Sequence, residues 1–372
     1  MFRTNSPAAT VLRWRVLRKR GEPLLVVPPS GKAAAASLAL YPAQTAKARL
    51  LRKFLRAALK LNLPLPLERA DVAVDVASPF ARFLTEQAGT KAFPQLGIFA
   101  GNPRTTGRRF ILLLFGEHNA PVCVVKAGLG EAAMQLIQRE QTFLASVPVS
   151  VAGVPKLFGT FRGENLSAFA MEFSDGQSPP VADETVVPTL VNAWAGGQRT
   201  VRLTETAPWK ALEAHCFFST CLERPGPTLA ARDAMCARLE KWPPVRGVLW
   251  HGDLAPWNLK MNRATGRVVV LDWERGELSG VPGWDWFHFL IQTAVLVKKL
   301  SVPALRDDLE RLLRSEKFLA YAQHCGIAGC ERELALAYLH YNIFVLRPSE
   351  GWEPIQALLE LFANSWTSDS KS

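Results

Sequence analysis

Hydrophobic and polar positions change their period along the chain, and the first changes lie near its start. Residues 11–17 and 24–27 are mostly apolar and flank a turn at residues 20–23, which predicts a β-hairpin. Residues 47–61 place apolar side chains at i, i+1, i+4, i+5 and i+8 with basic side chains opposite, which predicts a basic amphipathic helix. Pro64 and Pro66 end that helix.

From residue 95 the pattern becomes rich in strands. We expect strands at 95–100, 110–115, 122–126, 155–161 and 168–173, with a helix at 131–146. Beyond residue 176 the pattern is mostly helical. It predicts helices at 284–300, 303–324, 332–345 and 354–364, and one strand–loop–hairpin unit at 245–272.

This order of elements predicts an α+β fold with two lobes. The expected parts are a basic N-terminal extension at 1–94, a small antiparallel-sheet lobe at 95–173, a larger helical lobe at 174–366 and a frayed tail at 367–372. The lobes should join near residues 171–174.

Charge is distributed unevenly over these parts. The formal net charge is +11, yet residues 1–70 hold 14 lysines and arginines against two glutamates, a balance of +12. The rest of the chain therefore has a balance of −1. Basic character belongs to the extension, so we do not expect nucleic acid to be a partner of the whole protein.

Composition and cysteine spacing indicate a cytoplasmic protein. The chain is 48% hydrophobic and 21% charged, and no apolar stretch is long enough to cross a bilayer. The six cysteines show no C-x-x-C spacing, which favours reduced thiols over structural zinc.

The segment 249–258 and the hairpin after it carry the candidate chemistry. Asp253 precedes Asn258 by five positions, and the apolar strand 268–271 ends on Asp272. Phosphoryl transfer needs a carboxylate that holds and deprotonates the attacking hydroxyl, and oxygen ligands for the Mg²⁺ that bridges the nucleotide phosphates. These residue types at this spacing predict that chemistry, with Asp253 as base and Asn258 and Asp272 as metal ligands.

The same residues resemble the aminoglycoside phosphotransferase and choline kinase family, which has a protein-kinase-like fold. The resemblance rests on His251-Gly252-Asp253 with Pro256 and Asn258, then Leu271-Asp272-Trp273, and covers residues from about 95 to 350. It implies an ATP- and Mg²⁺-dependent enzyme with those three roles. It also implies that Asp285 braces the catalytic loop, where His251 lies too.

A nucleotide clamp should lie in the strand-rich lobe. Lys126 ends the apolar strand and suits the α- and β-phosphates. Glu140 lies in the middle of the apolar face of the following helix, whereas Glu131 points away. Because a carboxylate in an apolar stripe needs a cation, we expect Lys126 and Glu140 to pair.

Other nucleotide contacts are predicted by position. Residues 101–107 lack G-x-G-x-x-G, so the hydroxyls of Thr105 and Thr106 either cover phosphates or belong to an ordinary hairpin turn. Glu172 and Phe173 lie where the lobes join and are candidates for the adenine site.

The acceptor should lie near Asp253. Trp257, Trp273 and Glu274 are pocket candidates, because aromatic rings and a carboxylate suit an amino alcohol or a sugar. The alternative is that these tryptophans belong to the core. The acceptor is expected to be a hydroxyl of a small molecule.

The amphipathic helix leaves three interpretations open. It packs on the strand-rich lobe, it lies on an anionic membrane surface at the inner membrane face, or it contacts nucleic acid, for which it has few aromatic residues.

Two other functions compete with a small-molecule kinase. One is an inactive kinase-fold scaffold that docks an acidic or membrane partner through the basic segment. The other is a protein kinase, against which the short connection 273–283 argues, because it leaves no room for a long activation loop.

Overall fold

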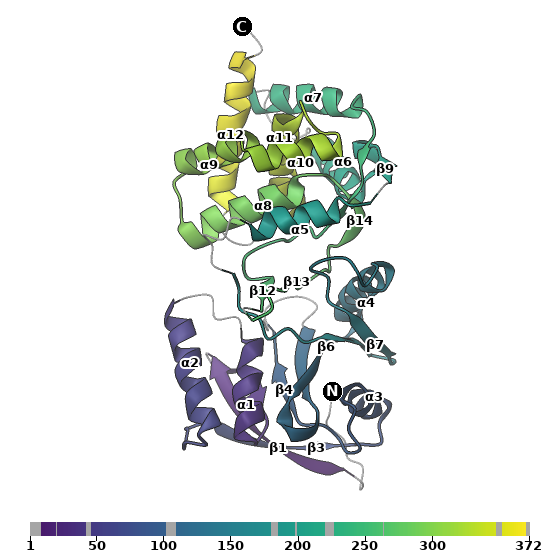
Figure 1. The fold of residues 1–372 in the computed structure, drawn as a ribbon, viewed down its shortest axis with the longest axis vertical. Helices are drawn as coiled ribbons and strands as arrows, with labels where there is room; N and C mark the ends of the chain where they lie inside the picture. Colours follow the sequence, from purple (N-terminus) through teal and green to yellow (C-terminus); the bar gives the residue numbers. More distant parts are fainter. Residues whose placement is uncertain are drawn as a thin grey trace. The chain divides into compact units, whose positions relative to one another are not determined.

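The structure is a computed structural model, and the chain in it forms two compact units. It describes residues 9–19, 21–41, 46–101, 109–179, 185–197, 199–219, 227–262, 264–346 and 352–369. The first unit comprises Met1–Val149 and Val154–Gly176, and the second comprises Ser150–Gly153 and Gln177–Ser372. Figure 1 labels the elements of both units.

An antiparallel sheet of eight strands is the centre of the first unit. Its order is β3-β1-β2-β4-β5-β6-β8-β7. The strands are β1 (Thr10–Lys19), β2 (Glu22–Val27), β3 (Glu68–Val74), β4 (Leu96–Phe99), β5 (Arg109–Phe115), β6 (Pro121–Leu129), β7 (Leu157–Arg162) and β8 (Leu166–Glu172). Strands from before and after residue 94 share this sheet, and residues 9–94 lie in the same unit as the strands that follow them.

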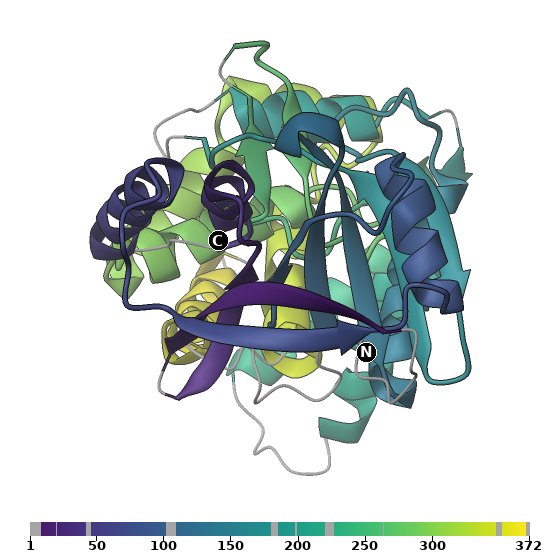
Figure 2. The same ribbon diagram turned by 90° about the horizontal axis from the view of Figure 1, so that it is seen from below.

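Helices cover both faces of this sheet. They are α1 (Gly31–Ser37), α2 (Ala46–Lys60), α3 (Pro79–Ala88) and α4 (Glu131–Ser146), with 3₁₀ turns η1 (Leu38–Leu40) and η2 (Glu117–Asn119). Val26 packs in the cluster that contains α3, whereas Leu25 and Val27 pack with α1 and α2. Since neighbouring strand residues point to opposite faces, α3 lies on one face and the α1–α2 pair on the other (Figure 2).

The second unit is mostly helical. Its helices are α5 (Val186–Trp194), α6 (Ala207–Ser219), α7 (Pro227–Glu240), α8 (Trp284–Gln292), α9 (Val302–Leu313), α10 (Glu316–Cys325), α11 (Glu331–Tyr341) and α12 (Trp352–Asp369), with 3₁₀ turn η3 (Leu203–Glu205) and π-helical segments η4 (Thr293–Lys298) and η5 (Asn342–Leu346). Trp284, Phe287, Phe318 and Tyr338 form an aromatic core between α8, α10 and α11.

Three two-stranded sheets complete the second unit. The pairs are β9 (Thr200–Val201) with β10 (Val245–Arg246), β11 (Val248–Trp250) with β14 (Glu277–Gly280), and β12 (Leu259–Met261) with β13 (Val268–Val270). The expected strand at 245–250 is thus interrupted at Gly247. The β12–β13 hairpin lies within the strand–loop–hairpin unit predicted at 245–272.

Two predicted helices differ from the structure. The helix expected at 303–324 is two helices, because Ser315 interrupts it and accepts a hydrogen bond from the Phe318 N–H as the N-cap of α10. The helix expected at 284–300 is α-helical only to Gln292 and continues as η4. Within the described ranges, no helix combines the length and hydropathy that crossing a membrane requires.

Candidate active site

A tight turn after β11 begins the candidate catalytic loop. Gly252 has φ 76°, in the left-handed region. A Cβ atom there would lie 2.9 Å from the Arg275 Cβ atom and 2.9 Å from the Trp250 ring. Only glycine fits this turn without displacing its neighbours.

The carboxylate of Asp285 holds the backbone of this turn. Its Oδ2 accepts a hydrogen bond from the His251 N–H at 2.7 Å, and its Oδ1 accepts one from the Gly252 N–H at 2.9 Å. Asp285 lies in the first turn of α8 and is buried. Burial raises the pKa of Asp285 to about 7, although the two N–H groups lower it. The helix therefore positions the loop through its backbone.

The buried imidazole of His251 connects the loop to the end of β13. Its Nδ1 accepts a hydrogen bond from the Asp253 N–H at 3.1 Å, so its Nε2 carries the proton and donates to the Leu271 carbonyl at 2.9 Å. Burial lowers the pKa of His251 to about 4, so the ring is neutral at pH 7. The ring also packs against Trp273.

Asp272 is placed beside the catalytic loop by the residue before it. The Leu271 N–H donates to the Asn258 carbonyl at 2.8 Å. Asp272 itself has φ 65°, a conformation that non-glycine residues adopt rarely and that is concentrated at functional sites. Asp272 lies just after the end of β13, and its side chain is partly buried.

Asp253 is fixed at both carboxylate oxygens. Its Oδ2 accepts a hydrogen bond from Asn258 Nδ2 at 3.2 Å, and Asn258 Nδ2 also donates to the Asp253 carbonyl at 2.9 Å. Its Oδ1 lies 3.1 Å from His288 Nε2. Burial alone would raise the pKa of Asp253, but the hydrogen bond from His288 and the nearby His288, His251 and Arg275 lower it overall. The side chain remains 36% exposed, so an ionised carboxylate faces solvent.

His288 is a site residue that the sequence analysis missed as a functional candidate. Its Nδ1 lies 2.7 Å from the Tyr338 hydroxyl, which accepts a hydrogen bond from Asn342 Nδ2 at 2.7 Å. Because that hydroxyl has its own proton to donate, His288 Nδ1 accepts it and His288 Nε2 donates to Asp253. His288 lies three residues after Asp285 on the same face of a helix, and this spacing is the signal in the sequence that could have pointed to it.

The expected acceptor-pocket residues separate into two groups. Trp273 is fully buried, donates from Nε1 to the Val270 carbonyl at 2.8 Å and packs on Trp194. It belongs to the core, which removes it from the pocket candidates. Trp257 and Glu274 are partly exposed.

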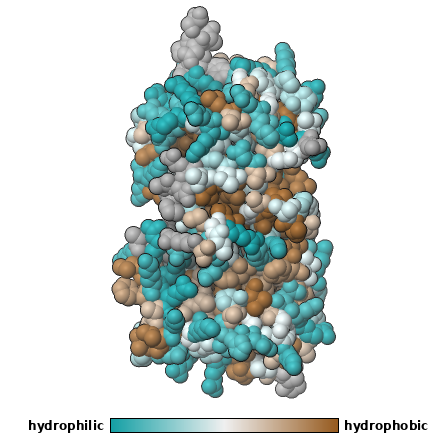
Figure 3. All heavy atoms as spheres, viewed as in Figure 1, coloured by the Kyte–Doolittle hydropathy of each residue, from teal (hydrophilic) through white to brown (hydrophobic). Residues whose placement is uncertain are grey.

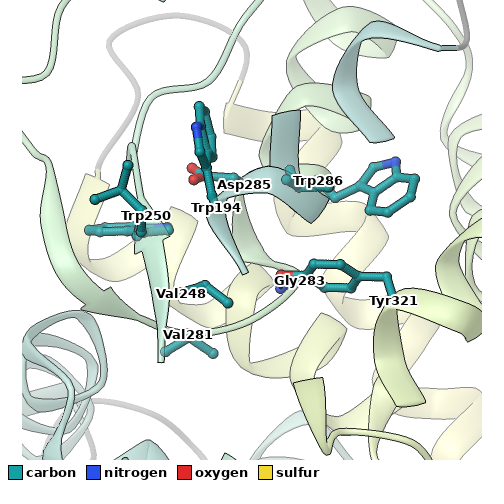
Figure 4. A pocket seen from close by; sticks show the side chains of 10 residues that line it. Trp194, Val248, Trp250, Val281, Gly283, Asp285, Trp286 and Tyr321 are labelled. Atoms are coloured by element: carbon teal, nitrogen blue, oxygen red, sulfur yellow. Dashed lines mark hydrogen bonds between the residues drawn. The ribbon is translucent and has the colours of Figure 1, made fainter. Parts of the chain in front are cut away.

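A small cavity in the second unit is lined by residues of α5, β11, α8 and α10 and by none of residues 251–258. Figure 4 shows Asp285 at this cavity together with Trp194, Trp250, Trp286 and Tyr321. The volume inside it that the centre of a water molecule can occupy is about 10 Å³. This is enough for one water molecule. It is therefore too small to hold a sugar or an amino alcohol.

The expected ion pair of the first unit is present. Lys126 Nζ lies 2.7 Å from Glu140 Oε1, and the side chains are 4% and 1% exposed. Lys126 lies within β6, and Glu140 faces it from α4. A Cβ atom on Gly128 would lie 2.6 Å from the Ala133 carbonyl oxygen, so glycine permits the close approach of helix and strand. Glu131 is exposed.

The remaining nucleotide-site candidates are less constrained. Glu172 ends β8, its N–H donates to the Lys156 carbonyl at 2.9 Å, and both Glu172 and Phe173 are partly exposed. Thr105 and Thr106 lie outside the described residues.

The donor set beside the loop fits Mg²⁺. Asn258 uses Nδ2 toward Asp253, so Oδ1 is the atom it can offer a cation, and Asp272 offers a carboxylate. Magnesium is commonly held by one or two protein oxygens together with phosphates and water. Among the described residues there is no group of three or more His, Cys, Asp or Glu side chains placed to hold a metal ion, so the amide oxygen of Asn258 is part of this donor set.

Comparison with known proteins identifies similar structures, although no family model and no curated protein matches the sequence. Aminoglycoside phosphotransferase APH(4)-Ia aligns with a TM-score of 0.50 and 14% identity, over 76% of this chain and 97% of that one. Plasmodium vivax ethanolamine kinase aligns with a TM-score of 0.44 and 11% identity, over 93% and 95% of the two chains. The fold agrees with the family resemblance carried by the catalytic-loop residues. The chain therefore has a bilobal, kinase-like α+β fold, as the sequence predicts.

Proposed function

We propose that this protein transfers a phosphoryl group from ATP to a hydroxyl of a small molecule, a sugar, an aminoglycoside-like compound or an amino alcohol. The observation that carries the proposal is the environment of Asp253. Its carboxylate is ionised, oriented by Asn258 and His288, and partly exposed to solvent. Such a group can accept a hydrogen bond from an incoming hydroxyl and then its proton.

The surrounding residues serve this reaction by position. Asn258 and Asp272 would hold Mg²⁺, which supplies charge neutralisation for the nucleotide phosphates. Lys126, oriented by Glu140, would bind the α- and β-phosphates. Glu172 and Phe173 remain the candidates for the adenine, and Trp257 and Glu274 for the acceptor. His251 and Asp285 keep the loop backbone in place.

The connection after Asp272 supports a small-molecule acceptor. In a protein kinase this connection contains a long regulatory loop. Here β14 follows within a few residues and pairs with β11, from Val248 opposite Gly280 to Trp250 opposite Glu277. An enzyme with so short a return needs no phosphorylation there to become active.

The test is turnover by the full chain with Mg²⁺ and ATP, measured as acceptor-dependent ADP release over a panel of sugars, aminoglycosides and amino alcohols. Asp253→Asn should lower kcat by about 10²–10⁴ while leaving Mg·ATP affinity nearly unchanged, because only the base is lost. Asp307→Asn, on the exposed side of α9, is the matched control and should have no effect.

Two results would contradict the proposal. The first is ATP binding without acceptor-dependent turnover anywhere on the panel, which is the behaviour of an inactive scaffold. The second is equal turnover by the parent protein and Asp253→Asn, which would remove Asp253 from the mechanism.

A further inference from the structure

Helix α2 is strongly basic, and only one of its sides packs against the first unit. Its sequence, AKARLLRKFLRAALK, contains six lysines or arginines and no acidic residue. One side of the helix packs on the first unit: Leu59 is fully buried and Leu55 is partly buried in the cluster that contains α1 and β2. The packing alternative for this helix is thus correct for that side.

The apolar residues on the rest of α2 are exposed. Leu50 and Leu51 are each 56% exposed and Phe54 is 66% exposed, and the segment after the helix adds Leu61 at 69% and Leu63 at 49%. These are the most exposed large apolar side chains to lie together in the described sequence. Apolar surface gathers at the edge of the first unit where α2 lies (Figures 1 and 3).

The exposed apolar and basic residues form adjacent stripes. At 100° per residue, Leu50 and Phe54 lie within about 40° of each other. Arg49, Lys53 and Arg56 occupy the neighbouring sector, between the apolar stripe and the packed side. All of these side chains are exposed. The outward surface of α2 therefore presents Leu and Phe side chains beside a row of cations.

The cations of this helix repel one another. The pKa of Arg52 is lowered by burial and by the charges of Arg56 and Arg49. An anionic surface placed against the helix would relieve this repulsion. A surface that also admits apolar side chains would remove Leu50 and Phe54 from water at the same time.

We propose that α2 docks the protein on an anionic lipid bilayer, with the helix lying in the plane of the interface. Leu50, Leu51 and Phe54 insert at the boundary between headgroups and acyl chains, and the basic stripe contacts the lipid phosphates. A second copy of the chain fits less well, because it would place six cations against six. Nucleic acid would satisfy the cations and leave the apolar stripe in water. This docking does not depend on the proposed phosphotransferase activity.

Vesicle sedimentation with the full chain tests the proposal. Vesicles of phosphatidylglycerol and phosphatidylcholine should bind the protein, more weakly as salt rises, and phosphatidylcholine vesicles should not. Lys53→Glu with Arg56→Glu should weaken binding on the order of twenty-fold or more. Leu50→Ser with Phe54→Ser, which keeps every charge, should weaken it on the order of tenfold or more.

Control variants elsewhere in the first unit distinguish binding through α2 from binding that depends only on overall charge or on any exposed aromatic side chain. Arg82→Glu with Lys91→Glu makes the same change of charge at exposed positions outside α2. Phe158→Ser removes an exposed phenylalanine, 49% exposed, from β7. Both controls should bind vesicles as the parent protein does. Circular dichroism should show that every variant is folded, because the changed side chains are exposed.

Three outcomes would overturn the proposal. One is no binding to anionic vesicles at low salt. Another is equal loss of binding in the control variants, which would indicate attraction by overall charge alone. The third is a dimer, seen by light scattering without lipid, that Leu50→Ser with Phe54→Ser dissociates; the apolar stripe would then cover a second copy of the chain.

Discussion

The two units hold their candidate functional side chains in different ways. In the first unit, Lys126 and Glu140 belong to a long strand and a four-turn helix, and a buried ion pair joins their side chains. In the second unit, Asp253 and Asp272 lie on short loops. Their positions depend on buried side chains that bind backbone groups, among them His251 and Asp285.

Because the two sites are held in different ways, we expect them to respond differently to substitutions and to pH. The first site depends on two opposite charges, so the loss of either leaves a buried charge without its partner. The second site depends on hydrogen bonds whose direction requires the neutral imidazole of His251 and the carboxylate of Asp285. We expect the first site to respond to charge removal and the second to protonation and to small changes of shape.

The largest effect should come from the ion pair of the first unit. Lys126→Met or Glu140→Gln alone should lower the free energy of unfolding by about 3–5 kcal/mol, because either change takes the oppositely charged side chain of the ion pair away from a buried charge. The double variant should be less damaged than the sum of the two, by about 1–3 kcal/mol. Urea unfolding of all four proteins measures this coupling. The exposed Arg18–Glu68 pair of the same unit is the control and should show little coupling. Strict additivity for Lys126 and Glu140 would mean that the ion pair does not fix this site.

The next largest effect should be a loss of stability at low pH that is caused by the buried His340. Burial, together with the charge of Arg232, lowers the pKa of His340 to about 3, whereas its unfolded value is about 6.5. Between these values the unfolded chain binds the proton and the folded chain does not. The free energy of unfolding should therefore fall as pH drops below 6.5, by about 3 kcal/mol at pH 4.5.

His340→Leu should remove that loss, so the difference between parent and variant should change by about 3 kcal/mol between pH 7 and pH 4.5. His251 acts in the same direction, and Asp285, whose pKa is raised to about 7, acts in the opposite one; both cancel in the difference. Exposed His118→Asn, in the first unit, is the control. A parent–variant difference that does not depend on pH would show that His340 titrates normally.

A smaller effect should follow from loosening the catalytic loop. Asp285→Asn keeps the shape of the side chain but turns one acceptor into an N–H group that faces a backbone N–H. The loss should be about 2 kcal/mol of stability, and kcat should fall because the Asp253 carboxylate is displaced. Asp307→Asn, exposed on α9 and paired only with the exposed Arg306 in the described contacts, is the matched control. Full activity in Asp285→Asn would show that the loop keeps its position without this carboxylate.

The smallest effect should come from His288. His288→Leu removes the donor to Asp253 Oδ1 and should lower kcat about tenfold, which is about 1.4 kcal/mol, while KM stays unchanged. His288→Gln keeps an N–H donor and should retain most of the activity. Equal losses in the two variants would mean that His288 acts through packing and not through its hydrogen bond.

Sequence patterns could predict most elements of the fold and part of the candidate site. Strands β4 to β8 and helices α2 and α4 followed from periodicity, and the Lys126–Glu140 contact followed from a carboxylate in an apolar stripe. Helix α3 was missed although its signals are present: Ser78 caps it, Pro79 begins it and Gly89 ends it in the left-handed conformation. Such signals are local, so they were available from the start.

The rest of the site depends on tertiary placement. That His288 reaches Asp253 requires α8 to lie against the loop, 35 residues away in sequence. The sequence left open whether Trp273 lies in the pocket or in the core, because a tryptophan after a strand can point either way; the structure places it in the core. The order of the first three strands also escaped prediction, since it pairs β3 with β1 across about 60 residues.

The pairing of β2 with β4 has a consequence for any shortened form of this protein. Leu25 and Val26 are hydrogen-bonded neighbours of Phe99 and Ile98. Removal of the first 74 residues would uncover the backbone N–H and carbonyl groups along β4, and the apolar side chains beneath α1 would lose their cover. An exposed apolar strand edge is a template for pairing with other chains. A form of the protein without these residues would thus expose an aggregation-prone strand edge, and its solubility would depend on residues that lie outside the candidate active site.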